Sequence, residues 1–325
     1  MNTARTRSPV AGHGTALALL TLLATPALAV PVVAPEFAGV YTIQSLGPVP
    51  ELPTPYGGLA FIDDDTLLIG GAANLEEGRL YTIDVSRDGD GHITGFLGTA
   101  TAFGNVGEWN DGGVVFGPGG VLFTVRWPVN ELGQTRPGDT DETRIIDLTP
   151  LGVSESPGGL MFVPGGLPGA GQLKIVSWDT GEWYTLALAA DGNGTYDVLS
   201  ATLHAVLPGG PEGIAYVPPG SPLFTDPSVL ISEWSDGNVA VYDVDADGNP
   251  IVASRRDFVI GLVGAEGALV DPVTGDFLFS TFIGTGDEVL RVQGFVAPPP
   301  VPEPGSLVLL AAGLAGLGFA RRRPA

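Results

Sequence analysis

Carboxylates stand near the start of several short apolar segments. Glu212 and Glu266 each precede a glycine, in Pro-Glu-Gly-Ile-Ala-Tyr and Ala-Glu-Gly-Ala-Leu-Val, and Asp111 and Glu155 lie close to two further glycine pairs. Carboxylates that converge on one point raise one another's pKa unless a cation neutralises them. Because calcium prefers oxygen ligands, Asp111, Glu212 and Glu266 are candidate ligands of a calcium ion.

Aromatic side chains form a second recurring set. Trp127, Trp178 and Trp234 each end a β-rich run, beside small polar or charged residues, and Phe282 is the matching residue of the last run. An amphipathic ring next to such residues holds neutral sugars by stacking and hydrogen bonding. The three tryptophans are therefore candidate ligand-binding residues. The alternative is that these rings only pack between neighbouring structural units.

Acidic turns at residues 88–91, 191–194 and 243–249 are a third set. The last opens as Asp-x-Asp-x-Asp-Gly, like a calcium loop, but Ser254 stands where such a loop needs a bidentate glutamate. Asp-Gly and Asn-Gly pairs are also what tight hairpins select. Their recurrence at matching places favours hairpin turns.

The composition excludes several classes of function. The chain has no cysteine, which rules out thiol catalysis, and only His92 and His204 lie beyond the N-terminal segment, neither in a recognisable motif. Against 14 basic residues there are 36 acidic ones, a net charge of −22. Such a body repels nucleic acid. Divalent cations and neutral glycans remain suitable partners.

The elements that position these residues repeat along the chain. A glycine-led apolar segment recurs with its second residue at Gly58, Gly113, Gly159, Gly213 and Gly267. β-rich runs and Asp/Gly/Asn turns follow each copy, and no long helical period interrupts them. Repeats of about 50 residues with four short strands are typical of propeller blades. We therefore expect an all-β fold, a five-bladed β-propeller.

The ends of the repeat array predict how the ring closes. The fifth unit stops after its third strand, at Gly294, whereas the first is preceded by an orphan strand, Phe37 to Leu46. If that strand completes the last blade, no blade keeps a bare edge. The second unit is the least regular, and its residues 130–142 are expected to form a polar loop. A six-bladed ring with one degenerate blade is the alternative.

Both ends of the chain indicate export. Residues 1–29 have a basic start, an apolar stretch and Ala-Leu-Ala, the pattern of a signal peptide with its helix. At the other end, a proline-rich spacer at 297–305 precedes an apolar run at 306–320, which is short for a transmembrane helix of roughly 20 residues. We expect a propeller domain at 30–296 and a short C-terminal transmembrane segment with a basic tail at 306–325.

The C-terminal segment resembles the PEP-CTERM sorting signal. The residues that carry the resemblance are the tripeptide Pro302, Glu303 and Pro304 and the basic end Arg321, Arg322 and Arg323. It implies processing by an exosortase, a membrane-embedded transpeptidase of Gram-negative bacteria that make exopolysaccharide. The protein would insert transiently in the inner membrane and then reach the cell surface or extracellular matrix. An ordinary C-terminal membrane anchor is the alternative.

A second resemblance concerns the propeller itself. Pro211-Glu212-Gly213-Ile214-Ala215 is similar to the Glu-Gly strand opening of gluconolactonase and strictosidine-synthase-like propellers, in which the glutamate faces a channel metal. Glu212 and Glu266 match that pattern. The leading expectation is a non-catalytic binding or matrix component that meets the export machinery, an exosortase and glycans. The alternative is a calcium-dependent hydrolase or lactonase that uses the channel carboxylates.

Overall fold

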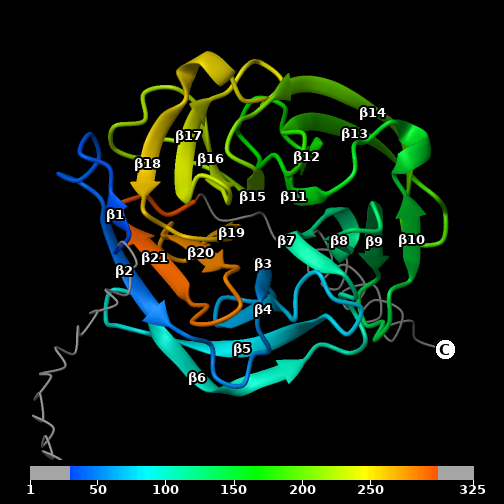
Figure 1. Ribbon diagram of the computed structural model, residues 1–325, viewed down its shortest axis with the longest axis horizontal. Coiled ribbons are helices and arrows are strands. Elements are labelled where there is room, and N and C mark those ends of the chain that lie inside the picture. The colour runs from blue at the N-terminus through cyan, green and yellow to red at the C-terminus, as the bar shows by residue number, and fades with distance from the viewer. Residues whose placement is uncertain (1–29, 299–325) are drawn as a thin grey trace, which may run out of the picture.

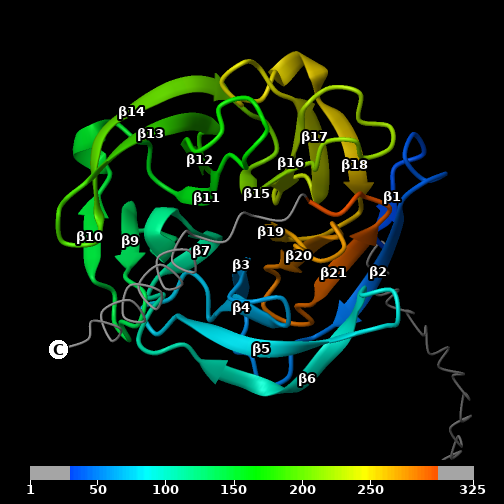
Figure 2. The same ribbon diagram turned by 180° about the vertical axis from the view of Figure 1, so that it is seen from behind.

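Five antiparallel sheets stand around one central axis (Figures 1 and 2). The computed structural model describes residues 30–298. Blade 1 comprises β3 (Tyr56–Phe61), β4 (Thr66–Gly71), β5 (Arg79–Arg87) and β6 (Ile93–Ala102); blade 2 comprises β7 (Asn110–Phe116), β8 (Leu122–Arg126), β9 (Glu131–Thr135) and β10 (Arg144–Asp147); blade 3 comprises β11 (Pro157–Phe162), β12 (Leu173–Ser177), β13 (Glu182–Ala190) and β14 (Tyr196–Val206).

The last two blades take strands from both ends of the described chain. Blade 4 comprises β15 (Pro211–Tyr216), β16 (Ser228–Glu233), β17 (Asn238–Asp243), β18 (Arg256–Ile260) and the short β1 (Val32–Val33); blade 5 comprises β19 (Ala265–Val270), β20 (Phe277–Thr281), β21 (Val289–Gln293) and β2 (Thr42–Gly47). Short 3₁₀ turns lie at Pro118–Gly120, Thr149–Leu151 and Val252–Ser254. The predicted five-bladed all-β propeller is confirmed, and the six-bladed alternative is wrong.

The N-terminal strand closes the ring, as predicted, but it begins later than the sequence indicated. β2 pairs with β21 from Thr42 opposite Gln293 to Gly47 opposite Val289. Residues 37–41 form turns instead of strand, held by N–H groups that donate to the carbonyls of Ala34 and Phe37. The turn buries the rings of Phe37 and Tyr41 against Phe258, which an extended strand would not do.

The second blade is regular where a polar loop was expected. Residues 131–135 form its third strand, β9, so the prediction is wrong there, whereas residues 136–142 form the expected loop. The polarity misled because Gln134 is fully buried, and its side-chain amide exchanges two 2.8 Å hydrogen bonds with the backbone of Tyr196 in blade 3. A polar side chain at this position bridges two blades and does not mark a loop.

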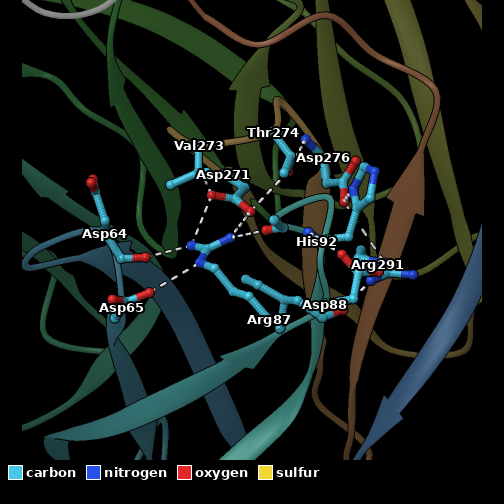
Figure 3. A network of polar contacts seen from close by, with 12 residues as sticks. Asp64, Asp65, Arg87, Asp88, His92, Asp271, Val273, Thr274, Asp276 and Arg291 are labelled. Atoms are coloured by element: carbon cyan, nitrogen blue, oxygen red, sulfur yellow. Dashed lines mark hydrogen bonds and ion pairs between the residues drawn. The ribbon is translucent and has the colours of Figure 1, made fainter.

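A network of charged side chains joins blade 1 to blade 5 where the ring closes (Figure 3). Arg87 at the end of β5 donates to both carboxylate oxygens of Asp271, at 2.6 and 3.1 Å, and to Asp65 at 3.2 Å. His92 Nδ1 lies 2.7 Å from Asp276 Oδ2. Asp271 and Asp276 are buried. These contacts complete the closure that β2 provides through its backbone.

The innermost strands of the blades touch through their backbones. A Cβ on Gly159 would collide with the carbonyl of Glu212 in the next blade, and one on Gly213 would collide with the backbone of β19. The glycine-led segments therefore recur because only glycine admits such close approach. Side chains at the starts of these strands consequently lie near one another.

Candidate functional site

Three carboxylates meet on the axis of the propeller. Asp111 lies in β7, and Glu212 and Glu266 are the second residues of β15 and β19. These innermost strands surround the axis, as Figure 1 shows. All three residues are buried, and one oxygen from each lies within 4.8 Å of the others. The structure therefore brings together the three residues singled out from the sequence.

Glycines in other blades make room for the carboxylates. Gly158 occupies in blade 3 the register position that Glu212 occupies in blade 4. A Cβ on Gly158 would collide with the carboxylate of Glu212, and one on Gly112 would lie 3.0 Å from Glu212 Oε2. The glutamates thus fill space that two other blades leave empty.

Burial makes the charged forms of these carboxylates unfavourable. Burial raises the pKa of Asp111 to about 7. Burial, and then the charge of Asp111, raise the pKa of Glu212 well above its ordinary value; burial, and then the charges of both neighbours, do the same for Glu266. Among the described residues, Glu212 Oε2 and Glu266 Oε1 have no hydrogen-bond partner. No positively charged side chain of the described residues lines the pocket beside these three carboxylates.

The cluster forms part of a pocket of about 340 Å³ that also contains the aromatic set. Trp127, Trp178 and Trp234 follow β8, β12 and β16, where the second strands end, and Phe282 follows β20. The second strand runs antiparallel to the first, so its end lies at the start of the innermost strand. Carboxylates and aromatic rings therefore share one end of the axis.

The rings also pack against one another. Trp178 and Trp234 meet edge to face at 5.8 Å between centroids, and Trp234 meets Phe282 in the same way at 6.4 Å. Trp127 Nε1 donates to Ser156 Oγ at 2.9 Å, and Trp234 Nε1 donates to the carbonyl of Phe282 at 3.1 Å. The tryptophans thus bridge blades and line the pocket at once, so the two interpretations of the aromatic set do not exclude each other.

Sequence reasoning missed the contribution of blade 1. At the position where the other blades have an aromatic ring, directly after the second strand, blade 1 has Ala72, and its next three residues, Ala73, Asn74 and Leu75, line the pocket. With its amide nitrogen turned toward the cluster, Asn74 donates to Asp111 Oδ1 at 3.0 Å and to the carbonyl of Asn110 at 3.1 Å. Asn74 also has a positive φ of 63°. Aligning the ends of the second strands points to Ala72 and so misses Asn74, two residues further on.

Other candidates lie away from the pocket. Glu155 is exposed and does not line it. In the turn at residues 243–249, Asp245 Oδ1 accepts the N–H groups of Asp247 and Asn249, as a hairpin turn requires. The ammonium of Lys174 donates to Asn249 Oδ1 at 2.8 Å, so a cation already faces this turn. His204 lies on β14 with its side chain exposed.

The predicted terminal segments lie outside the described residues. These are the signal peptide at 1–29, the tripeptide Pro302, Glu303 and Pro304, the apolar segment, and the basic end Arg321, Arg322 and Arg323. Between residues 30 and 298 there is no helix with the length and apolar character needed to cross a membrane.

Comparison with known proteins gives matches of two kinds. A PEP-CTERM protein-sorting motif matches residues 300–323. No curated protein matches the sequence. Among solved structures, an auxiliary nutrient binding protein from Bacteroides ovatus is 11% identical, with 78% of this chain and 76% of that one covered and a TM-score of 0.44.

Two further structures are similar at the same low level. A putative 6-phosphogluconolactonase from Bacteroides uniformis is 14% identical, with 75% of this chain and 69% of that one covered and a TM-score of 0.40. The calcium structure of a Trichoderma reesei carbohydrate-active enzyme of family AA12 is 9% identical, with coverage of 85% and 99% and a TM-score of 0.44. The chain is a five-bladed β-propeller that carries a C-terminal PEP-CTERM protein-sorting motif.

Proposed function

We propose that this protein is an exported binding component of the cell envelope or extracellular matrix, with its ligand site in the pocket lined by the three carboxylates and the aromatic rings. The observation that carries the proposal is the buried cluster of Asp111, Glu212 and Glu266, to which the described residues supply no positive partner and which shares its pocket with three tryptophans. Protonation or a bound cation relieves such a group of charges. We favour the cation because it engages all three carboxylates at once.

Calcium fits the donor set. All three side chains offer carboxylate oxygens, and oxygens within 4.8 Å of one another can contact one ion at about 2.3–2.6 Å. Magnesium demands near-octahedral geometry and keeps several of its waters. A buried cluster of three carboxylates from three different blades suits that ion less well. When bound, calcium would supply a site for the hydroxyl oxygens of a ligand.

The ligand class follows from the pocket walls. A volume of about 340 Å³ lies at the lower end of the range for small-molecule sites, roughly 300–1,000 Å³. Tryptophan rings offer apolar faces to a sugar ring, and carboxylates accept hydrogen bonds from its hydroxyl groups. No basic side chain of the described residues lines the pocket, so the protein itself offers an anionic ligand no positive side chain there. One or two residues of a neutral glycan fit this chemistry.

The test is binding of neutral glycans to the purified protein with and without calcium. We expect binding without turnover, loss of binding on chelation, and about fivefold weaker binding in Trp178→Ala, because stacking on one aromatic ring is worth on the order of 1 kcal/mol. Trp183→Phe is a control, because that ring is fully buried and does not line the pocket. Glycan binding that Trp178→Ala leaves unchanged would contradict the assignment of the pocket.

A second candidate is a calcium-dependent hydrolase or lactonase. The observation that favours it is the convergence of three carboxylates on one pocket, where a bound calcium would polarise the carbonyl group of a substrate. Hydrolysis of sugar lactones by the purified protein, abolished in Asp111→Asn, would establish this activity. Glycan binding with no turnover of lactones would contradict the hydrolase and support the binding role.

The sorting motif yields a separate prediction. Changing Pro302, Glu303 and Pro304 together to alanine should leave full-length protein in the inner membrane, because the processing enzyme loses its recognition site while the apolar segment persists. Membrane fractionation and mass spectrometry of the C-terminus measure the outcome. Identical mature C-termini in variant and wild type would contradict exosortase-type processing.

A further inference from the structure

One backbone conformation recurs at the rim of the pocket. In blades 2 to 5 the residue directly before the innermost strand has a positive φ, at Trp109 (58°), Ser156 (65°), Gly210 (65°) and Gly264 (69°). In each of these blades the carbonyl of that residue accepts the N–H of the rim aromatic residue, at 2.8 or 2.9 Å. The conformation is therefore part of how each blade holds its aromatic residue in place.

Tryptophan is an unfavourable residue for this position. Glycine adopts a positive φ without strain, whereas for a bulky side chain the same conformation is an outlier that costs free energy. Blades 4 and 5 have glycine here, but blade 2 has Trp109. Strained residues of this kind cluster at binding sites and ligand clamps. Trp109 therefore indicates a role other than stabilising the fold.

The equivalent residues show where a side chain at this position points. Ser156 Oγ accepts the indole N–H of Trp127 at 2.9 Å, and a Cβ on Gly210 would lie 2.7 Å from Trp178 Nε1. In both cases the neighbour is the rim ring of the preceding blade. By the same register, Trp109 is directed at the rim of blade 1, which has no aromatic residue among those that line the pocket.

Backbone contacts place Trp109 directly beside the pocket. Its N–H donates to the carbonyl of Leu75 at 3.0 Å, and its carbonyl accepts the N–H of Trp127 at 2.9 Å; both partners line the pocket. Leu75 is 40% exposed, and Trp109 is partly exposed. Trp109 does not itself line the pocket, so with Leu75 it extends the apolar surface of the rim outward. We call these two residues the rim ledge.

We propose that the rim ledge is a second sugar subsite and that the ligand is an oligosaccharide that leaves the pocket over blade 1. The inference rests on the proposed glycan-binding function. The pocket of about 340 Å³ holds one or two sugar residues, and Trp109 offers the next one a stacking surface. The side chain of Glu108, its neighbour in the chain, is 43% exposed and accepts hydrogen bonds from hydroxyl groups.

The shape of the rim favours this course for the ligand. Blade 1 contributes the small side chains Ala73 and Asn74 to the pocket, where the other blades contribute aromatic rings. A chain that continues beyond the pocket meets the least obstruction there, and the rim ledge is the apolar surface that it meets next. The site is therefore built for a stretch of glycan chain and not for a free monosaccharide.

Affinity as a function of chain length tests the second subsite. The probes are neutral oligosaccharides of glucose, galactose, mannose and xylose, each from one to six residues long, arrayed against the purified protein with calcium. We expect the sugar type that binds to bind about fivefold more tightly once the chain is long enough to reach the rim ledge, at three or four residues, because it gains one more aromatic stack.

Two substitutions of Trp109 sharpen the test. Trp109→Gly removes the ring and introduces the residue that Gly210 and Gly264 provide at equivalent positions, so its melting temperature should stay within a few degrees of the wild type. Its affinity for the longer chains should fall to that for the disaccharide, while its affinity for the mono- and disaccharide stays unchanged. Trp109→Tyr keeps an aromatic face and should retain the dependence on length.

The remaining outcomes separate this inference from the proposed function. Affinity of the unmutated protein that is independent of chain length would overturn the second subsite and leave the pocket as the whole site. A loss in Trp109→Gly that is equal for all lengths, or no loss at all, would overturn it as well. Binding of none of the probes, or binding that Trp178→Ala leaves unchanged, would contradict the proposed function itself, and the second subsite with it.

Discussion

Deleting residues 30–47 is expected to abolish cooperative folding of the propeller. The deletion removes β2, which leaves the backbone of β21 without its partner. It also removes the fully buried ring of Phe37 and the nearly fully buried ring of Tyr41. Loss of one large buried aromatic side chain costs about 3–5 kcal/mol, and total stability is typically about 5–15 kcal/mol. Two such losses and an open blade edge exhaust most of that margin.

A shorter deletion is the matched control. Removing residues 30–33 takes away only β1, a two-residue strand on the outer edge of blade 4 in which Val32 is 47% exposed. We expect a small shift of the melting temperature for this variant, and no cooperative transition for the longer deletion in calorimetry or circular dichroism. A domain lacking residues 30–47 that melts within a few degrees of the wild type would show that the N-terminal strand does not close the ring.

The fold was predictable because its repeats record a packing constraint. Gly159 and Gly213 recur at their positions since the innermost strands touch through their backbones, and no other residue fits. The meeting of Glu212 with Glu266 and of Trp178 with Trp234 followed from the same alignment. Equivalent positions in successive blades lie around one axis, so a linear period in the sequence becomes a ring in space.

What the sequence concealed depends on contacts between distant residues. Arg87 pairs with Asp271 across 184 positions, and no local pattern marks either residue. Gln134 looked like part of a loop because its partner is the backbone of the next blade. Phe37 and Tyr41 looked like strand residues, whereas their rings define a turn. Asn74 lines the site from the one blade of the described ring that has no aromatic residue in the pocket.

The calcium-free protein is expected to be more stable at pH 5 than at pH 8. Burial and mutual repulsion raise the pKa values of Asp111, Glu212 and Glu266 in the folded state, whereas in the unfolded chain these groups titrate near pH 4. Between these values the folded state binds more protons than the unfolded one, so the free energy of unfolding falls as the pH rises. For Asp111, with a folded pKa of about 7, the loss is complete only above that pH.

The expected size of this effect is at least about 2 kcal/mol between pH 5 and pH 8, a melting-temperature change of roughly 5 °C for a domain of this length. Calcium should reverse the trend, because it binds the ionised carboxylates of the folded state only. At a calcium concentration one hundred times the dissociation constant, the gain is about 2.7 kcal/mol. Melting curves at the two pH values, with calcium and with a chelator, measure both terms.

The double substitution Glu212→Gln and Glu266→Gln separates the cluster from the rest of the titration. It keeps the volume of both side chains and removes their charges, so the chelated variant should be at least as stable as the wild type at pH 8, with a flatter pH dependence and no gain from calcium. The control is Glu76→Gln with Glu77→Gln, an equal change of charge on two exposed residues that line no pocket. If calcium does not raise the melting temperature of the unmutated protein, no calcium binds at the cluster. That result would also contradict the calcium-dependent glycan binding and the hydrolase candidate.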